Sequence, residues 1–157
     1  MAVSVDDPDA DPDQESLDLL KNGPLYPFTD PPRKHIDPTV NRAGVYTIWH
    51  KNELVYAGFS GKDGSKSGPV GRLLSHRSGG RSGDKFCIYV CDRYVLPELT
   101  SNQIQQVVAG PLKLDERTRD FIRGELTYRF ARCENEAVAK ALEDKGDSRC
   151  PRNTADA

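Results

Sequence analysis

Residues 44–60 read GVYTIWHKNELVYAGFS, in which two apolar runs are separated by a short polar link around residues 50–52. Both runs are rich in β-branched and aromatic residues, which favour extended backbone. A link this short joins neighbouring antiparallel strands. The stretch therefore predicts a β-hairpin with strands at 44–49 and 53–59.

The length of the hairpin loop decides which face each tyrosine occupies. A two-residue loop at 51–52 would pair position 46 with 57 and place Tyr46 and Tyr56 on opposite faces, because side chains alternate along a strand. A three-residue loop at 50–52 would pair Tyr46 with Tyr56 and place both on one face. Asn52 tolerates the left-handed backbone that such a loop needs at its last position, which favours the three-residue loop.

The rest of the chain alternates between helical and extended patterns of apolar residues. We expect helices at 14–22, 70–78, 101–108, 115–124 and 134–145, and further strands at 86–91 and 126–133. These elements predict an α+β fold, with a central antiparallel sheet of three or more strands flanked by helices. Arg72 and His76 are one turn apart in the second helix and therefore project side by side.

The chain of 157 residues fits one domain. Residues 1–40 are acidic and proline-rich, and we interpret them as a tail followed by an extended arm that wraps a globular body. The domain itself is predicted at 41–153, with an insertion around 92–125 and a short C-terminal tail at 154–157.

Formal net charge is −2, but the charge is unevenly distributed along the chain. Acidic residues dominate the first thirty positions, whereas Lys and Arg are in excess between 31 and 100. That basic segment also carries the hairpin and the Arg72 helix, as a phosphate-binding surface would require. No run of about 18 apolar residues is present and the N-terminus is acidic, so we expect no membrane segment and a cytoplasmic location.

The four cysteines are Cys87, Cys91, Cys133 and Cys150. A cytoplasmic location favours reduced thiols over disulfides. Structural zinc is the alternative, but Cys87 and Cys91 stand in a run predicted as a buried strand. Zinc-binding cysteine pairs usually occupy a tight turn.

The triplets at 44–46 and 56–58 resemble the paired strands that give GIY-YIG nucleases their name, with Val and Ala at the two middle positions. Tyr56 follows Tyr46 by ten positions. The following elements also match the family's order: a helix with an arginine (Arg72), a strand, a helix with a glutamate (Glu143), and a late Pro-x-Asn at 151–153. The resemblance covers roughly residues 41–153 and depends on this ordered conjunction.

Arg72 and His76 form an RxxxH pattern that is similar to the restriction-endonuclease-like branch of the family. The resemblance implies that Tyr46 positions the attacking water or takes its proton, with assistance from His76. It implies that Arg72 binds the scissile phosphate, and that Tyr56 hydrogen-bonds the phosphate or the nucleophile. Without the resemblance, both tyrosines would be read as core residues, and Arg72 and His76 as a pair on a helix surface.

The resemblance also implies a divalent cation, Mg²⁺ (or Mn²⁺), with Glu143 as its one protein ligand and Glu136 as the alternative. Glu143 could instead only contact Lys140 on its own helix. The resemblance further implies that Asn153 lines the back of the site or contacts phosphate. Four basic residues are expected to contact DNA phosphates: Lys62, Lys66, Arg77 and Arg81.

These features predict a metal-dependent DNA endonuclease, hydrolysing phosphodiester bonds in restriction or DNA defence. The chain leaves no room for a separate DNA-binding domain, so the arm and the insertion are the candidates for sequence recognition. A homodimer with one active site per strand is the expected assembly. The competing hypotheses are a nucleic-acid-binding module that keeps the fold without catalysis, and a zinc-stabilised interaction domain.

Overall fold

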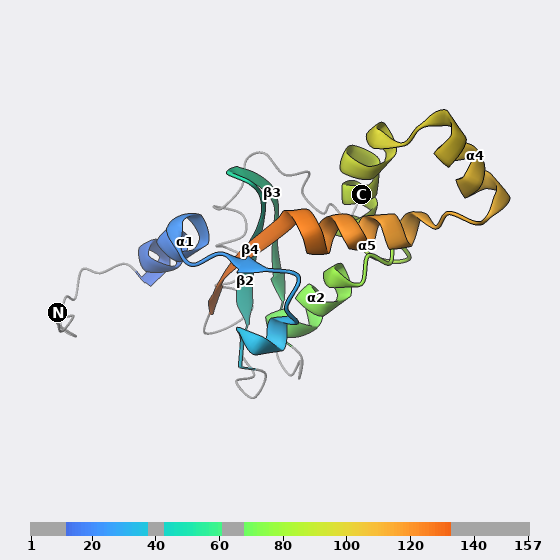
Figure 1. The fold of residues 1–157 in the computed structure, drawn as a ribbon. Coiled ribbons are helices and arrows are strands. Elements are labelled where there is room, and N and C mark those ends of the chain that lie inside the picture. Colours follow the sequence, from blue (N-terminus) through green and yellow to red (C-terminus); the bar gives the residue numbers. More distant parts are fainter. Residues whose placement is uncertain (1–11, 38–42, 61–67, 133–157) are drawn as a thin grey trace, which may run out of the picture.

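The structure is a computed structural model that describes residues 12–37, 43–60 and 68–132. A four-stranded antiparallel sheet in the order β1-β4-β2-β3 forms its centre (Figure 1). The strands are β1 (Tyr26–Pro27), β2 (Gly44–His50), β3 (Glu53–Ser60) and β4 (Leu126–Arg132). The predicted α+β class is confirmed.

Helices cover both faces of the sheet. The α-helices are α1 (Pro12–Asn22), α2 (Gly68–Arg77), α3 (Lys85–Val90), α4 (Ser101–Ala109) and α5 (Leu114–Glu125), and short 3-10 or π-helical turns lie at Pro32–Lys34, Cys91–Val95 and Leu96–Glu98. Helix α1 lies on one face, while α2, α3 and α5 contribute to the core on the other. Among the described helices, none is long and apolar enough to cross a bilayer.

The hairpin has the two-residue loop at Lys51 and Asn52, so the prediction of a three-residue loop is wrong. The left-handed residue is Lys51, with φ of 56°, rather than Asn52. Val55 then forms a β-bulge: Ile48 pairs with Tyr56, whereas Trp49 pairs with Leu54. Because the extra residue restores the alternation, Tyr46, opposite Gly58, shares a face with Tyr56 after all.

The prediction of a strand at 86–91 is also wrong, because this segment is helical. Asp84 begins α3 as its N-cap, its side chain accepting a hydrogen bond from the backbone N–H of Cys87. Phe86, Cys87, Val90 and Cys91 are buried and lie on one side of the helix that continues into the π-helical turn. An apolar run of six residues fits a strand or a helix equally well, and Asp84 is the local signal that favours the helix.

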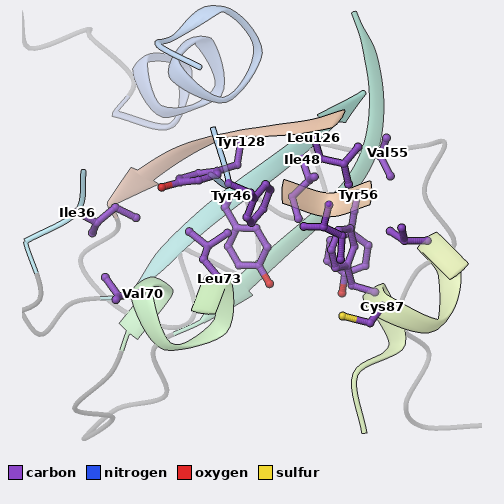
Figure 2. Close-up of a cluster of buried hydrophobic side chains, with 14 residues drawn as sticks. Ile36, Tyr46, Ile48, Val55, Tyr56, Val70, Leu73, Cys87, Leu126 and Tyr128 are labelled. Atoms are coloured by element: carbon purple, nitrogen blue, oxygen red, sulfur yellow. The ribbon is translucent and has the colours of Figure 1, made fainter. Parts of the chain in front are cut away.

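The main core lies between the sheet and helices α2, α3 and α5. Figure 2 shows Tyr46 and Tyr56 in this cluster, with Leu73 from α2 and Cys87 from α3 beside them. Ile122 of α5 is fully buried in the same core. The segment 92–125, which was predicted as an insertion, thus includes a helix that belongs to the core.

The N-terminal arm is part of the folded body. Leu20 packs with Val45 and Ala131 on the α1 side of the sheet, whereas Phe28 and Ile36 are buried in the main core. β1 also adds a strand to the sheet beside β4. The domain boundary expected near residue 41 thus does not separate the arm from the body.

Helix α4 projects from the body beyond the end of α5 (Figure 1), and none of its residues is buried. A capping box between Thr100 and Gln103 fixes its start. Gly110 ends it in the left-handed conformation, with φ of 106°. Local signals alone therefore define this helix, which explains why its limits follow the prediction closely.

Candidate functional site

The site is built where the hairpin meets helix α2. Tyr46 comes from β2, Tyr56 from β3 and His76 from the last turn of α2. The phenol of Tyr46 lies directly over Gly58, where an added Cβ would be 2.5 Å from Tyr46 Oη. The glycine of the second triplet therefore provides the space that the tyrosine of the first triplet occupies.

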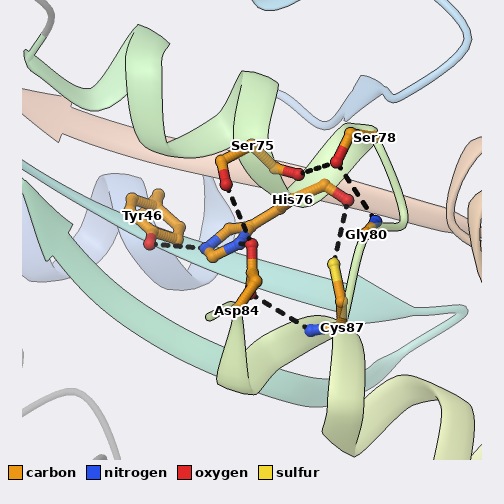
Figure 3. Close-up of polar contacts among 7 residues, drawn as sticks. All are labelled: Tyr46, Ser75, His76, Ser78, Gly80, Asp84 and Cys87. Carbon is orange, nitrogen blue, oxygen red and sulfur yellow. Dashed lines mark hydrogen bonds and ion pairs between the residues drawn. The ribbon is translucent and has the colours of Figure 1, made fainter. Parts of the chain in front are cut away.

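A chain of short hydrogen bonds joins strand β2 to helix α2 and to the start of helix α3 (Figure 3). Tyr46 Oη lies 2.8 Å from His76 Nε2, and His76 Nδ1 lies 2.8 Å from Asp84 Oδ2. Asp84 Oδ2 also accepts from the Ser75 hydroxyl at 3.1 Å, and its Oδ1 accepts from Cys87 N at 3.2 Å. Both carboxylate oxygens are therefore engaged inside the protein.

The chain is enclosed by aromatic rings. The ring centroid of His76 lies 4.6 Å from that of Phe86 and 5.7 Å from that of Tyr56. Tyr46, His76 and Asp84 expose only 1%, 0% and 3% of their surface. Because an unpaired polar group at this depth is costly, the mutual hydrogen bonds are needed to keep these three side chains together.

Burial and neighbouring charges set the protonation of the three groups. Burial raises the pKa of Tyr46 well above its ordinary value; the charges of Tyr56 and Asp84 raise it further, and Arg72 lowers it in part. Burial lowers the pKa of His76 despite its bond to Asp84. For Asp84, burial is outweighed by the hydrogen bond and charge of His76, so its pKa is lowered. The resting site holds a phenol, a neutral imidazole and a carboxylate.

Arg72 lies close enough to lower the pKa of both Tyr46 and His76 through its charge. Arg72 itself is half-buried. It is the one partly exposed residue in this group of predicted catalytic residues. The structure thus brings Tyr46, Tyr56, Arg72 and His76 close to one another.

The two predicted phosphate-binding arginines that the structure describes have partners within the chain. Arg77 donates from Nε to the carbonyl of Phe28 at 2.8 Å and from Nη2 to that of Thr29 at 3.0 Å. Arg81 pairs with Asp115 at 2.6 Å. Arg77 therefore anchors the arm, and neither side chain is directed only toward solvent.

The expected metal ligand, Glu143, lies outside the described residues, together with Glu136, Asn153, Lys62 and Lys66. In the part of the chain that the structure describes, no group of three or more His, Cys, Asp or Glu side chains could hold an ion. Asp84, the acidic residue of the site, has both oxygens engaged.

Cys87 and Cys91 are buried free thiols. Burial raises the pKa of Cys87 and disfavours the thiolate that zinc binds. Its Sγ instead donates to the carbonyl of His76 at 3.4 Å. The other two cysteines, at positions 133 and 150, lie outside the described residues.

Asp84 is the residue that sequence reasoning missed. Its position before an apolar run is typical of a helix N-cap, and a helical interpretation of residues 85–90 would have placed it at the start of α3. The turn after α2 then brings that start back to His76. The error in secondary structure thus also concealed part of the site.

Comparisons with known proteins identify no relative. A scan against protein-family models, a search of curated proteins and a search of solved structures gave no significant match.

Proposed function

We propose that the protein is a metal-dependent endonuclease of the GIY-YIG type, which hydrolyses phosphodiester bonds in DNA. The observation that carries the proposal is the meeting of Tyr46, His76 and Arg72 at one point. The two motif strands and the RxxxH helix are separate in the sequence, yet their polar side chains converge. A set of unrelated core residues has no reason to combine a phenol, an imidazole and a guanidinium.

The proposed chemistry begins with a water molecule beside Tyr46. As the water attacks phosphorus, Tyr46 Oη takes its proton and passes its own proton to His76 Nε2, which lies 2.8 Å away. The imidazole is suited to this step because its lowered pKa keeps it unprotonated near neutral pH. Arg72, which is half-exposed, binds the phosphate and offsets the negative charge that develops during attack.

The proposal includes the features that accompany the resemblance. These are a dependence on Mg²⁺ (or Mn²⁺) through Glu143, a contact of Tyr56 with the phosphate or nucleophile, and action as a homodimer on DNA in the cytoplasm. The divalent cation would stabilise charge on the phosphate and on the leaving oxygen. Restriction or DNA defence is the proposed setting.

Nicking of supercoiled plasmid in the presence of Mg²⁺ or Mn²⁺ tests the proposal. Tyr46→Phe removes the relay hydroxyl and should reduce cleavage by about 10²-fold or more. Tyr128→Phe is the matched control, since Tyr128 is equally buried on the same sheet but its hydroxyl has no hydrogen-bond partner among the described residues. It should cleave like the wild type, and both variants should bind DNA.

The alternative is a binding module that retains the fold without catalysis. The burial of Tyr46 and His76 favours it, because a purely structural network would also be enclosed. DNA binding with no cleavage by the wild type, across Mg²⁺, Mn²⁺ and several DNA substrates, would establish this alternative. Equal cleavage by Tyr46→Phe and the wild type would refute the assigned role of Tyr46.

A further inference from the structure

His76 can exist as either of two neutral tautomers, and only one suits the proposed relay. To accept the proton of Tyr46, Nε2 must be bare and the ring hydrogen must be on Nδ1. In the other tautomer Nε2 carries the hydrogen and donates to Tyr46 Oη, so the imidazole has no capacity to take a proton there. Whether Tyr46 donates or accepts in its hydrogen bond with Nε2 therefore depends on whether Nδ1, on the other side of the imidazole ring, carries the hydrogen.

We infer that Asp84 is a positioning residue which holds His76 in the Nδ1–H tautomer and thereby makes Nε2 the acceptor for Tyr46. This inference depends on the proposed function for its catalytic consequence, but its structural basis is independent. Asp84 Oδ2 lies 2.8 Å from Nδ1, and a carboxylate in this place can only accept. The lowered pKa of Asp84 supports an ionised carboxylate here.

The described groups around Asp84 determine the direction of each of its hydrogen bonds. Oδ1 accepts from the backbone N–H of Cys87, which cannot reverse its role. Oδ2 accepts from the Ser75 hydroxyl in addition to the His76 ring. Arg72, the cation that affects His76, carries no acceptor and cannot compete for Nδ1–H. Three donors thus converge on one carboxylate, and α3 and α2 fix it from both sides.

Asparagine at position 84 would reverse the direction of the hydrogen bond to His76 Nδ1. Its amide oxygen must face Cys87 N, because that donor is fixed, whereas the Ser75 hydroxyl and the His76 ring can both change from donor to acceptor. The NH₂ group would then donate to Nδ1 and force the hydrogen onto Nε2. Asn is as good an N-cap as Asp, so α3 should keep its start.

Serine at position 84 is the matched second variant. Its hydroxyl can still cap α3 but is too short to reach His76, so neither tautomer is imposed. A purely structural role for Asp84 predicts that the near-isosteric Asn is the milder change. The positioning role predicts the opposite order, with Asn the more damaging variant.

Nitrogen NMR of protein labelled with ¹⁵N-histidine tests the inference directly, because the shifts of the two ring nitrogens distinguish the tautomers. The His76 signals are assigned by their loss in His76→Gln. We expect Nδ1–H in the wild type at neutral pH and Nε2–H in Asp84→Asn. An Nε2–H tautomer in the wild type, or an unchanged tautomer in Asp84→Asn, would overturn the inference.

Plasmid cleavage gives the second readout. Asp84→Asn should lower kcat by about 10²–10⁴-fold with KM for DNA unchanged, and Asp84→Ser should lose less. Higher activity of Asn than of Ser refutes the positioning role even if the protein is a nuclease. If the wild type cleaves no DNA, the proposed function fails, and the NMR result still decides what Asp84 does to His76.

Discussion

Gly58 on β3 has no room for a side chain, and its replacement by alanine tests the geometry of the site. An added Cβ would lie 2.5 Å from Tyr46 Oη and 2.6 Å from Tyr46 Cζ. Tyr46 is 1% exposed and its hydroxyl is bonded to His76, so the ring cannot shift far without losing that bond. Either the ring or the strand must move in Gly58→Ala.

Two costs follow from that movement. Overpacking a well-filled core costs about 1–3 kcal/mol. Displacement of the phenol also leaves His76 Nε2 buried without its partner, which costs about 1–3 kcal/mol. The reduced flexibility of the unfolded chain returns roughly 0.4–1 kcal/mol to an alanine variant. We therefore expect Gly58→Ala to lower the free energy of unfolding by about 2–4 kcal/mol, or roughly 5–15 °C in Tm.

Urea unfolding of Gly58→Ala and Gly124→Ala provides the assay. Gly124 lies in α5, where an added Cβ meets no atom of another described element within 4 Å, so alanine there should be neutral or stabilise by up to about 1 kcal/mol. In a Tyr46→Leu background, Gly58→Ala should cost at least about 1 kcal/mol less, since the opposing ring is absent. If Gly58→Ala is as stable as the wild type, or if its cost is the same in both backgrounds, the close approach is not real.

Two further predictions concern stability. Burial lowers the pKa of His76 in the folded protein, so the unfolded chain binds a proton more readily than the folded one. The neutral His76 therefore contributes to the free energy of unfolding above a pH of about 6.5, and this contribution is lost as the pH falls through the folded pKa. The excess stability of the wild type over His76→Gln in urea should thus shrink between pH 7.5 and 5, and a constant difference contradicts the shift. Separately, Arg77→Ala removes two hydrogen bonds to the arm and should lower the free energy of unfolding by about 1–3 kcal/mol. It should also speed proteolytic cleavage before residue 38. Arg33→Ala, at an exposed position, is the control and should have neither effect. Weaker DNA binding by Arg77→Ala at unchanged stability and proteolysis would instead assign this side chain to phosphate.

The hairpin illustrates how a correct conclusion can follow from a wrong intermediate. Its strands were predictable because β-branched and aromatic residues dominate them. The loop length was not, since Lys51 adopts a left-handed conformation without being Gly or Asn. A bulge at Val55 then returned Tyr56 to the face of Tyr46, and no local pattern in the sequence marks that bulge. The face on which Tyr56 lies depends on the number of residues in the loop and in the bulge together, so the loop length alone does not determine it.

The arm and α3 were mispredicted for a different reason, because tertiary packing decided both. The prolines of the arm indicate extended chain, but they do not show that Phe28 and Ile36 enter the core. Burial of α3 on the sheet likewise outweighs the β propensity of its aromatic and branched residues. By contrast, α4 was predictable from Thr100 and Gly110 alone, since it has little tertiary contact to override its caps.

The protonation of the resting site restricts how the proposed relay can operate. A phenol whose pKa is raised by burial cannot be a phenolate before substrate arrives. Among the described residues, Arg72 is the group that lowers that pKa, and a bound phosphate would partly neutralise its charge. Prior loss of the Tyr46 proton is therefore least favourable when the substrate is in place. The proton must move to His76 as the water attacks, which is why the orientation of the imidazole matters more than the acidity of the phenol.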